Sequence, residues 1–293
     1  MDKYWELSKT LPNAKNHEII GDFLLSLKLA NRSQRTIVLY RCFLERFFGN
    51  TNEQFSSLTS DEIQQWFRQH EGHVKETTFR LRLSVLSSFY TFCVQEEYIV
   101  NSPIKSRWFP RLPQPIPKYL EKGDIAKTRQ QSEKTSLRNQ AMLEFMLSSG
   151  CRVGELNELN REDMDLENRT AHVIGKGKKI REVHFSDKCA VLLERYFASQ
   201  RMPSKALFVN SKGKRIGTRR IQIIVNQMGK EAGLSTRLHP HRLRHTFATE
   251  LLSKGAELSF IAEELGHSNV DTTRIYARLP KREIIALYRK YMG

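Results

Sequence analysis

The sequence lacks the features that mark membrane and secreted proteins. No apolar run approaches the roughly 18 residues that a bilayer-spanning helix needs. The first residues, Met1–Glu6, contain no apolar signal region, so secretion is not expected. The cysteines lie far apart without paired spacing, at Cys42, Cys93, Cys151 and Cys189. This spacing excludes a thiolate zinc site and is typical of reduced, buried thiols, so we expect a cytoplasmic protein.

Motifs of nucleotide-driven and metal-dependent enzymes are also missing. No glycine-rich loop ends in Gly-Lys-Ser/Thr, so work driven by nucleotide hydrolysis is not expected. One acidic run lacks the glycine and the spacing of a calcium loop and is better interpreted as a solvated turn (Glu162, Asp163, Asp165 and Glu167). Three histidines cluster at His239, His241 and His245, but no glutamate follows the first one and arginines lie between them. We therefore predict neither a metal nor a cofactor.

Positive charge is in clear excess. Lysine and arginine total 48 against 32 aspartates and glutamates, a formal net charge of +16, and most of the excess lies after residue 117. Such an excess is typical of proteins that bind polyanions, and nucleic acid is the commonest such partner. A generic solubilising surface is the alternative that composition alone leaves open.

Length and hydrophobic patterning predict two domains. The chain has 293 residues, about twice the usual ~150-residue domain. Up to residue 103, hydrophobic residues recur at helical spacing in successive runs (19–27, 37–48, 59–72 and 76–96). Ser33 is expected to cap the second helix, and Thr59 with Glu62 is expected to form a capping box at the third. Residues 1–103 are therefore predicted to form a small helical bundle.

A proline-rich stretch separates the two parts. Its prolines are Pro103, Pro110, Pro113, Pro115 and Pro117. They are too many for a helix and unsuited to a central strand. Residues 104–117 are predicted to be an extended, semi-rigid linker, although a plain surface loop has the same composition.

The second part, residues 118–293, is predicted to be mostly helical with a small antiparallel sheet. β-like runs at 170–174 and 180–185 flank the glycine-rich 175–179 and indicate a hairpin. Helical patterns precede and follow this hairpin (123–131, 136–148, 187–199, 218–232, 240–253, 257–265 and 281–291). The predicted fold class is mainly α, with a small antiparallel β-sheet in an α+β C-terminal domain.

Several cationic residues stand where a phosphate could be held. Arg152 follows a helix-stopping glycine at the start of a new helix, where backbone N–H groups and a guanidinium together favour an anion. Lys176 lies in the expected hairpin turn, and His241 and Arg244 share one helix face at i and i+3. Each feature is weak when taken singly, since a lone arginine is more often a salt-bridge partner.

The sequences around these residues, in this order, resemble the tyrosine recombinase, or phage integrase, family. Gly-x-Arg-x-x-Glu-Leu surrounds Arg152, Ile-Gly-Lys-Gly-x-Lys surrounds Lys176, and His-x-Leu-Arg-His-Thr-Phe-Ala-Thr begins at His241. Leu-Gly-His-Ser contains His267, and Thr-Thr-x-Ile-Tyr ends at Tyr276. The resemblance is close in the second part and looser in the helical first part. The compact length, without an arm-binding extension, is most similar to the Xer recombinases and the small transposon resolvases.

The resemblance implies a domain plan and a nucleophile. Residues 1–103 would form a SAM-like core-binding domain, and residues 118–293 a catalytic domain that ends in an exchange helix. Tyr276 is implied as the nucleophile that forms a covalent 3′-phosphotyrosine and leaves a free 5′-hydroxyl. Strands would be rejoined without ATP because the covalent ester conserves the bond energy.

The remaining motif residues are implied to assist this step. Arg152 and Arg244 would clamp the non-bridging phosphate oxygens, and Lys176 would protonate the leaving 5′-oxygen, with Lys178 and Lys179 as open alternatives. His241 would support proton transfer from the tyrosine, and His267 would orient a phosphate oxygen. Glu155 is expected to be a partner of Arg152 rather than a base.

The family also implies partners. These are double-stranded DNA with an inverted-repeat core site, clasped by both domains, and a homotetramer built from one dimer on each of two paired sites. A sister recombinase or an accessory protein is left open, as is the event served: resolution of multimers or of transposon cointegrates, or integration and excision of a mobile element. The DNA target sequence and the order of strand exchange are open as well.

Three other functions remain to be weighed. A sequence-specific DNA-binding regulator needs the basic surface but not the complete motif set. A type IB topoisomerase shares the residue chemistry but relaxes DNA without pairing sites, and the Xer-like flanking sequences disfavour it. A metal nuclease needs a carboxylate cluster, which the sequence does not provide.

Overall fold

The chain forms two compact units. The computed structural model describes residues 3–113, 118–175, 179–200 and 204–266. One unit covers Met1–Gln114 and the other Pro115–Gly293. Each unit has a hydrophobic core of its own, which is the usual property of a domain.

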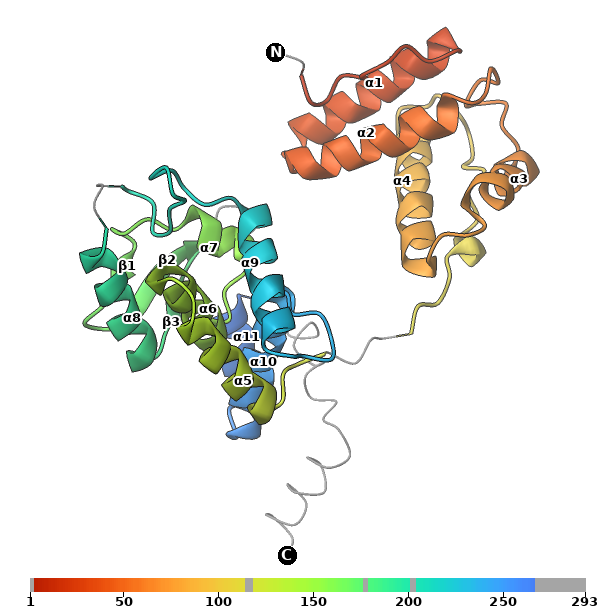
Figure 1. The fold of residues 1–293 in the computed structure, drawn as a ribbon. Coiled ribbons are helices and arrows are strands. Elements are labelled where there is room, and N and C mark those ends of the chain that lie inside the picture. The colour runs from red at the N-terminus through yellow and green to blue at the C-terminus, as the bar shows by residue number, and fades with distance from the viewer. Residues whose placement is uncertain (1–2, 114–117, 176–178, 201–203, 267–293) are drawn as a thin grey trace, which may run out of the picture. The chain divides into compact units, whose positions relative to one another are not determined.

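Helices make up the first unit (Figure 1). Its described α-helices are α1 Ala14–Leu29, α2 Gln34–Phe48, α3 Ser60–Glu71 and α4 Glu76–Gln95. The apolar positions that recur at helical spacing in the sequence are the buried ones, for example Ile19, Phe23 and Leu24 of α1. The predicted helical bundle is therefore confirmed.

Helix starts in this unit follow the sequence signals. The Ser33 hydroxyl accepts from the backbone N–H of Thr36 at 3.2 Å. At α3, Thr59 and Glu62 satisfy each other: the Thr59 backbone N–H donates to the Glu62 carboxylate at 2.7 Å, and the Glu62 N–H donates to the Thr59 hydroxyl at 3.3 Å. Each such cap satisfies donors that the first helical turn leaves without partners.

The first core is aromatic and lies beside buried charge, of which Glu71 is the deepest example. The rings of Phe23 and Phe89 meet edge to face with centroids 5.6 Å apart, an arrangement that suits the ring quadrupoles. Glu71 has a fully buried side chain and forms ion pairs with Arg46 and Arg82. Two cations on one buried carboxylate offset the large cost of removing it from water.

The segment after α4 is attached to this unit. Ile104, Trp108 and Phe109 pack against the first core, and Ser106–Trp108 form a 3-10 turn. The first half of the segment expected to be an extended linker, residues 104–117, thus contributes apolar side chains to the N-terminal unit. Residues 114–117 lie outside the described part.

The second unit is an α+β domain (Figure 1). Its described helices are α5 Lys122–Glu133, α6 Leu137–Ser149, α7 Val153–Glu158, α8 Asp187–Ala198, α9 Thr218–Glu231, α10 Pro240–Ser253 and α11 Leu258–Leu265. Six of these agree with the predicted helices to within one or two residues. The seventh, α7, is the short helix expected to start after Arg152.

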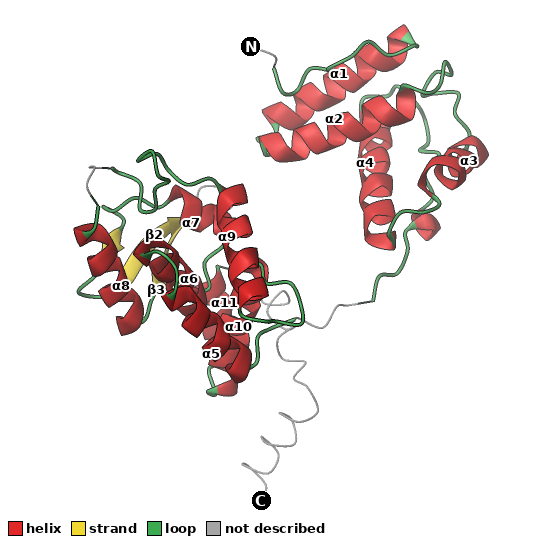
Figure 2. Cartoon of the chain, viewed as in Figure 1, coloured by secondary structure: helices red, strands yellow, loops and turns green. Residues whose placement is uncertain are grey.

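A small antiparallel sheet lies among these helices (Figure 2). Strand β2, Thr170–Ile174, pairs with β3, Ile180–His184, in the register that places Ile174 opposite Ile180. The two-residue strand β1, Met164–Asp165, adds to the outer edge of β2. The hairpin is the predicted one, whereas β1 is too short to show a period-2 pattern in the sequence.

Helix α6 is the centre of the second core. Residues 141–147 are all buried, because α5, α8 and α10 pack around this helix. It ends at Gly150, whose φ of 60° is left-handed, and a Cβ there would overlap the ring of Phe247. Glycine is therefore required both by the backbone conformation and by the close approach of α10.

The fold class predicted from the sequence, mainly α with a small antiparallel sheet, is confirmed. Among the described helices, none combines the length and the apolar character needed to cross a bilayer.

Candidate active site

Three of the predicted site residues line one pocket in the second unit. Arg152, His241 and Arg244 surround a pocket of about 330 Å³, together with Ile174 and Gly175 at the root of the β2–β3 hairpin. Segments about 90 residues apart in the chain meet here because α10 packs along α6. The meeting of these three residues follows from the tertiary fold rather than from local sequence.

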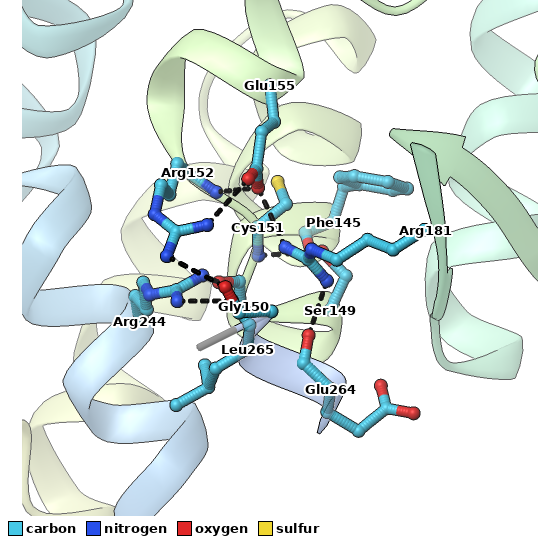
Figure 3. A network of polar contacts seen from close by, with 11 residues as sticks. Phe145, Ser149, Gly150, Cys151, Arg152, Glu155, Arg181, Arg244, Glu264 and Leu265 are labelled. Carbon is cyan, nitrogen blue, oxygen red and sulfur yellow. Dashed lines mark hydrogen bonds and ion pairs between the residues drawn. The ribbon is translucent and has the colours of Figure 1, made fainter. Parts of the chain in front are cut away.

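Arg152 stands at the turn between α6 and α7. Its Nη1 donates to Glu155 Oε1 at 2.7 Å, and its backbone N–H donates to Glu155 Oε2 at 2.8 Å (Figure 3). Glu155 is 4% exposed, whereas the Arg152 side chain is 35% exposed. The expected partnership is therefore present, and it fixes the Nη1 edge of the guanidinium while the side chain stays partly exposed at the pocket.

Arg244 is the more deeply placed arginine. It is 4% exposed, and its Nη1 donates to the Gly150 carbonyl at 2.7 Å while Nη2 donates to the Leu265 carbonyl at 2.5 Å (Figure 3). These carbonyls stand at the C-terminal ends of α6 and α11, where a helix leaves its last acceptors without partners and its dipole is negative. Arg244 thereby joins two helix ends beside the pocket.

His241 lies one turn before Arg244 on α10. Partial burial, followed by the nearby guanidinium groups of Arg244 and Arg152, lowers the pKa of His241 below its usual value. The ring of His245 is stacked on it with centroids 6.3 Å apart, and burial lowers the pKa of His245 to about 4. Both rings are accordingly neutral at pH 7, and a neutral imidazole has one nitrogen that can accept a proton.

The hairpin contributes Ile174 and Gly175, at the end of β2, to the pocket lining. Ile174 and Ile180 face each other across the ladder and are 53% and 63% exposed. The Gly175 N–H donates to the Lys179 carbonyl at 2.8 Å, which closes the base of the turn. Lys176 and Lys178 occupy this turn and lie outside the described residues.

Two more predicted residues, His267 and Tyr276, also lie outside the described residues, as does the expected exchange helix at 281–291. The description ends at Gly266, whose φ of 61° is left-handed and which closes α11. The Arg152 Nη2 donates to the Gly266 carbonyl at 3.4 Å. The chain therefore leaves the described part beside the pocket, directly before His267.

Sequence reasoning missed Arg181 on β3. Its side chain is 12% exposed, and its Nη2 donates to Glu155 Oε2 at 2.8 Å (Figure 3). A signal for it existed, since Arg181 alternates with Val183 on β3 and with Phe185 just beyond it, both buried. An arginine on the core side of a strand requires a buried partner.

The arrangement has the electrostatics of an anion site. Arg152, Arg181 and Arg244 carry three positive charges, and Glu155 is the carboxylate that bonds to Arg152 and Arg181 (Figure 3). The Glu264 carboxylate, also drawn there, pairs with His184 instead. The three guanidinium groups and Glu155 together carry two net positive charges beside the pocket. Within the described residues, no group of three or more histidine, cysteine or acidic side chains is arranged to hold a metal ion. The arginines are thus the groups present that can neutralise a phosphate.

Comparison with known families matches both units. Residues 118–283 match the phage integrase family. Residues 20–97 match the phage integrase N-terminal SAM-like domain. Together the two matches span both compact units.

Individual relatives cover nearly the full length. The tyrosine recombinase XerC of Thermodesulfovibrio yellowstonii is 33% identical over 286 residues, covering 92% of this chain and 95% of the relative. The tyrosine recombinase XerC of Halalkalibacterium halodurans is 33% identical over 297 residues, covering 94% and 98%. Among solved structures, XerA recombinase is similar with a TM-score of 0.57 at 26% identity, covering 94% of this chain and 98% of that one. XerH bound to a palindromic difH substrate after cleavage has the same fold, with a TM-score of 0.75 at 19% identity over 99% and 92%.

Proposed function

The chain belongs to the phage integrase family of site-specific tyrosine recombinases, and we propose that it cuts and rejoins DNA through Tyr276. The Tyr276 oxygen attacks the scissile phosphorus while the bond from phosphorus to the 5′-oxygen breaks. The products are a 3′-phosphotyrosyl bond and a free 5′-hydroxyl. Attack by the 5′-hydroxyl of another strand reverses these steps, so no ATP is consumed.

The described residues suit the charge and proton balance of this step. Arg152 and Arg244 meet the non-bridging oxygens as negative charge grows on the phosphorane. His241, neutral because of its lowered pKa, takes the proton that leaves the tyrosine. Lys176, in the turn that follows Gly175, gives a proton to the 5′-oxygen, and His267 orients a phosphate oxygen.

One observation carries the proposal: Arg152, His241 and Arg244 converge on one pocket at the root of the hairpin that holds Lys176. A regulator that only binds DNA has no need for such a convergence behind its surface. A relaxing topoisomerase finds no support among the relatives named above, which are recombinases.

A nicked suicide substrate tests the nucleophile. On such DNA the cleaved strand loses a short fragment, and the covalent adduct accumulates. Tyr276→Phe should retain specific DNA binding and form no adduct, whereas Tyr288→Phe and Tyr291→Phe should still form it, as matched controls from the same C-terminal stretch. Recovery of a phosphotyrosyl peptide with any tyrosine other than Tyr276 contradicts the assignment.

The DNA partner is a core site of paired half-sites. XerH, which shares the fold, is bound to a palindromic difH substrate, and a palindrome suits two protomers related by two-fold symmetry. We further propose that two such dimers pair into a tetramer, either alone or with a sister recombinase or accessory protein. The substrate is chromosomal or mobile-element DNA, which with the unpaired cysteines favours the cytoplasm.

A groove in the second unit suits the tetramer contact. We call it the α10–α11 groove; it has a volume of about 340 Å³, and its lining includes the apolar residues Phe247, Leu251 and Phe260 beside acidic and basic side chains such as Glu250 and Lys254. Phe260 is 47% exposed. Residues 281–291 offer a matching apolar pattern, with apolar residues at helical spacing (Ile284, Ile285, Leu287, Tyr288 and Tyr291). The proposed occupant is this segment of a neighbouring protomer.

A further inference from the structure

Three successive carbonyls at the end of α11 each accept from a different arginine. Glu264 O accepts from Arg181 Nη1, Leu265 O from Arg244 Nη2 at 2.5 Å, and Gly266 O from Arg152 Nη2 at 3.4 Å. These carbonyls have no acceptor role inside the helix, and they form its negative end. Two of the donors belong to the catalytic motifs, and the third, Arg181, belongs to none of the motifs that identify the family here.

Arg181 also shares a carboxylate with Arg152. Glu155 Oε2 accepts from the Arg152 backbone N–H and from Arg181 Nη2, both at 2.8 Å, while Oε1 accepts from Arg152 Nη1 at 2.7 Å (Figure 3). Glu155 is 4% exposed, so solvent screens this group little. If Arg181 were absent, the carboxylate would be paired with Arg152 alone.

Gly266 rests directly on Arg181. A Cβ at Gly266 would overlap the Nε and Cδ atoms of Arg181, and the left-handed φ of 61° separately favours glycine there. The Arg181 side chain therefore forms the surface against which the last described turn lies. The next residue in the chain is His267.

From these contacts we propose that Arg181 is a positioning residue for strand cleavage, an inference that rests on the proposed function. Its guanidinium ties β3, the strand that follows the Lys176 turn, to Glu155 and to the end of α11. It thereby orients Arg152 and sets where the chain carrying His267 and Tyr276 begins. Arg181 touches neither the tyrosine nor the phosphate in this scheme and acts through its neighbours.

The positive charge of Arg181 gives this residue a second role in the proposed reaction. With Arg181 in place, Arg152, Arg181 and Arg244 against Glu155 leave two positive charges in excess. With an uncharged side chain at position 181 the excess falls to one, and Glu155 turns fully toward Arg152. The phosphorane then forms in a weaker positive field, so cleavage slows even where DNA remains bound.

Arg181→Met removes the fork and the charge while keeping an apolar stem of similar length. We expect DNA binding within about 3-fold of the wild type and single-turnover adduct formation about 10- to 100-fold slower, the range found when residues that orient an active group are removed. Arg138→Met is the matched control. Arg138 is also partly buried and bonded to a carbonyl, that of Val209 at 2.9 Å, but it lies in the first turn of α6, about 18 Å from Gly150 along the helix. The Arg138→Met variant should have a lower free energy of unfolding but form the adduct at the wild-type rate.

A substrate with a methylphosphonate at the scissile position separates positioning from mere stability. That linkage lacks one anionic oxygen, so its transition state requires less positive charge. On this DNA, Arg181→Met should form the adduct only a few-fold more slowly than the wild type. Arg181→Lys restores the charge without the forked guanidinium, so on ordinary DNA its rate should lie between those of the wild type and Arg181→Met.

The outcomes are distinct. If the wild type forms no adduct on ordinary DNA, the proposed function itself fails. If the wild type forms it and Arg181→Met cleaves equally fast, the inference about Arg181 is overturned while the function stands. Equal slowing on both substrates, in step with a fall in the folded fraction measured by thermal unfolding, overturns it too and reduces Arg181 to a structural residue.

Discussion

Arg152 and Arg244, the two described arginines proposed to bind the phosphate, differ in exposure, and this suits them to different parts in the proposed reaction. Arg244 is 4% exposed, and two of its N–H groups donate to the Gly150 and Leu265 carbonyls. Since a guanidinium does not deprotonate in proteins, Arg244 keeps a fixed positive charge beside the pocket. Arg152 is 35% exposed and is the more open of the two to an arriving phosphate. A lysine could not replace Arg244, because one ammonium does not span two helix ends.

The proposed role of Lys176 can be tested by replacing the 5′-bridging oxygen of the DNA, which is the leaving atom, with sulfur. If it protonates the departing 5′-oxygen, Lys176→Ala should slow cleavage on ordinary DNA by about 10²- to 10⁴-fold, the usual contribution of a general acid. DNA with sulfur at the 5′-bridging position should restore most of the rate, because a thiolate leaves without a proton. Single-turnover adduct formation on both substrates measures this.

Lys179→Ala is the control for that test, because Lys179 is described, exposed and three residues away in the same hairpin. It should cleave both substrates at nearly the wild-type rate. Equal defects of Lys176→Ala on oxygen and sulfur substrates would make Lys176 a DNA-binding residue instead.

At the scale of elements, local chemistry explains why most of the fold was predictable. Ser33 and the Thr59–Glu62 pair start helices through hydrogen bonds within one turn, so sequence alone reveals them. The β2–β3 hairpin is equally local, since its strands are joined by a short glycine-containing turn. The motif residues were found through their flanking sequences, which also lie within single elements.

Contacts between distant segments were not predictable in this way. Strand β1 exists because Met164 pairs with Ala171, and two residues are too few to show a period. The bonds of Arg181 to Glu155 and to the end of α11 span 26 and 83 positions of the chain. Such partners are set by tertiary packing rather than by local propensity. In the sequence alone, where these partners are not visible, Arg181 looks like one more surface cation.

The proposed exchange helix is the element whose removal should separate binding from assembly. Truncation after Leu279 should leave binding to a single site unchanged, because the pocket with Arg152 and Arg244 stays intact, and should abolish pairing of sites and recombination. Phe260→Ser in the α10–α11 groove should weaken pairing in the same way, since its half-exposed ring would lose the apolar segment it covers. Gel mobility of one-site and two-site complexes reports both effects.

Val191→Ser is the matched control for the groove. Val191 lies on α8, is 50% exposed and does not line the α10–α11 groove. Its substitution should leave pairing unchanged. Wild-type recombination by the truncated protein would contradict docking of the C-terminal segment altogether.

At the scale of the molecule, net charge governs how the protein meets DNA before any chemistry. The formal charge of +16 produces a long-range attraction to a polyanion that speeds encounter and does not depend on sequence. Specific contacts then select the core site, while phosphate contacts fix the register. Two units matched to two domains of one family supply a large surface for such contacts.

The salt dependence of the DNA-binding constant measures how much of the affinity is electrostatic. Each phosphate that the protein neutralises releases counterions, so the logarithm of the binding constant should fall linearly with the logarithm of salt concentration. With roughly 6–10 phosphate contacts, affinity should drop by ~10³–10⁵ between 50 and 200 mM salt. Sucrose at matched osmolality is the control, because it changes water activity without adding ions and should leave the constant nearly unchanged. A binding constant that stays flat across the salt range would mean that the basic excess lies away from DNA and serves solubility instead.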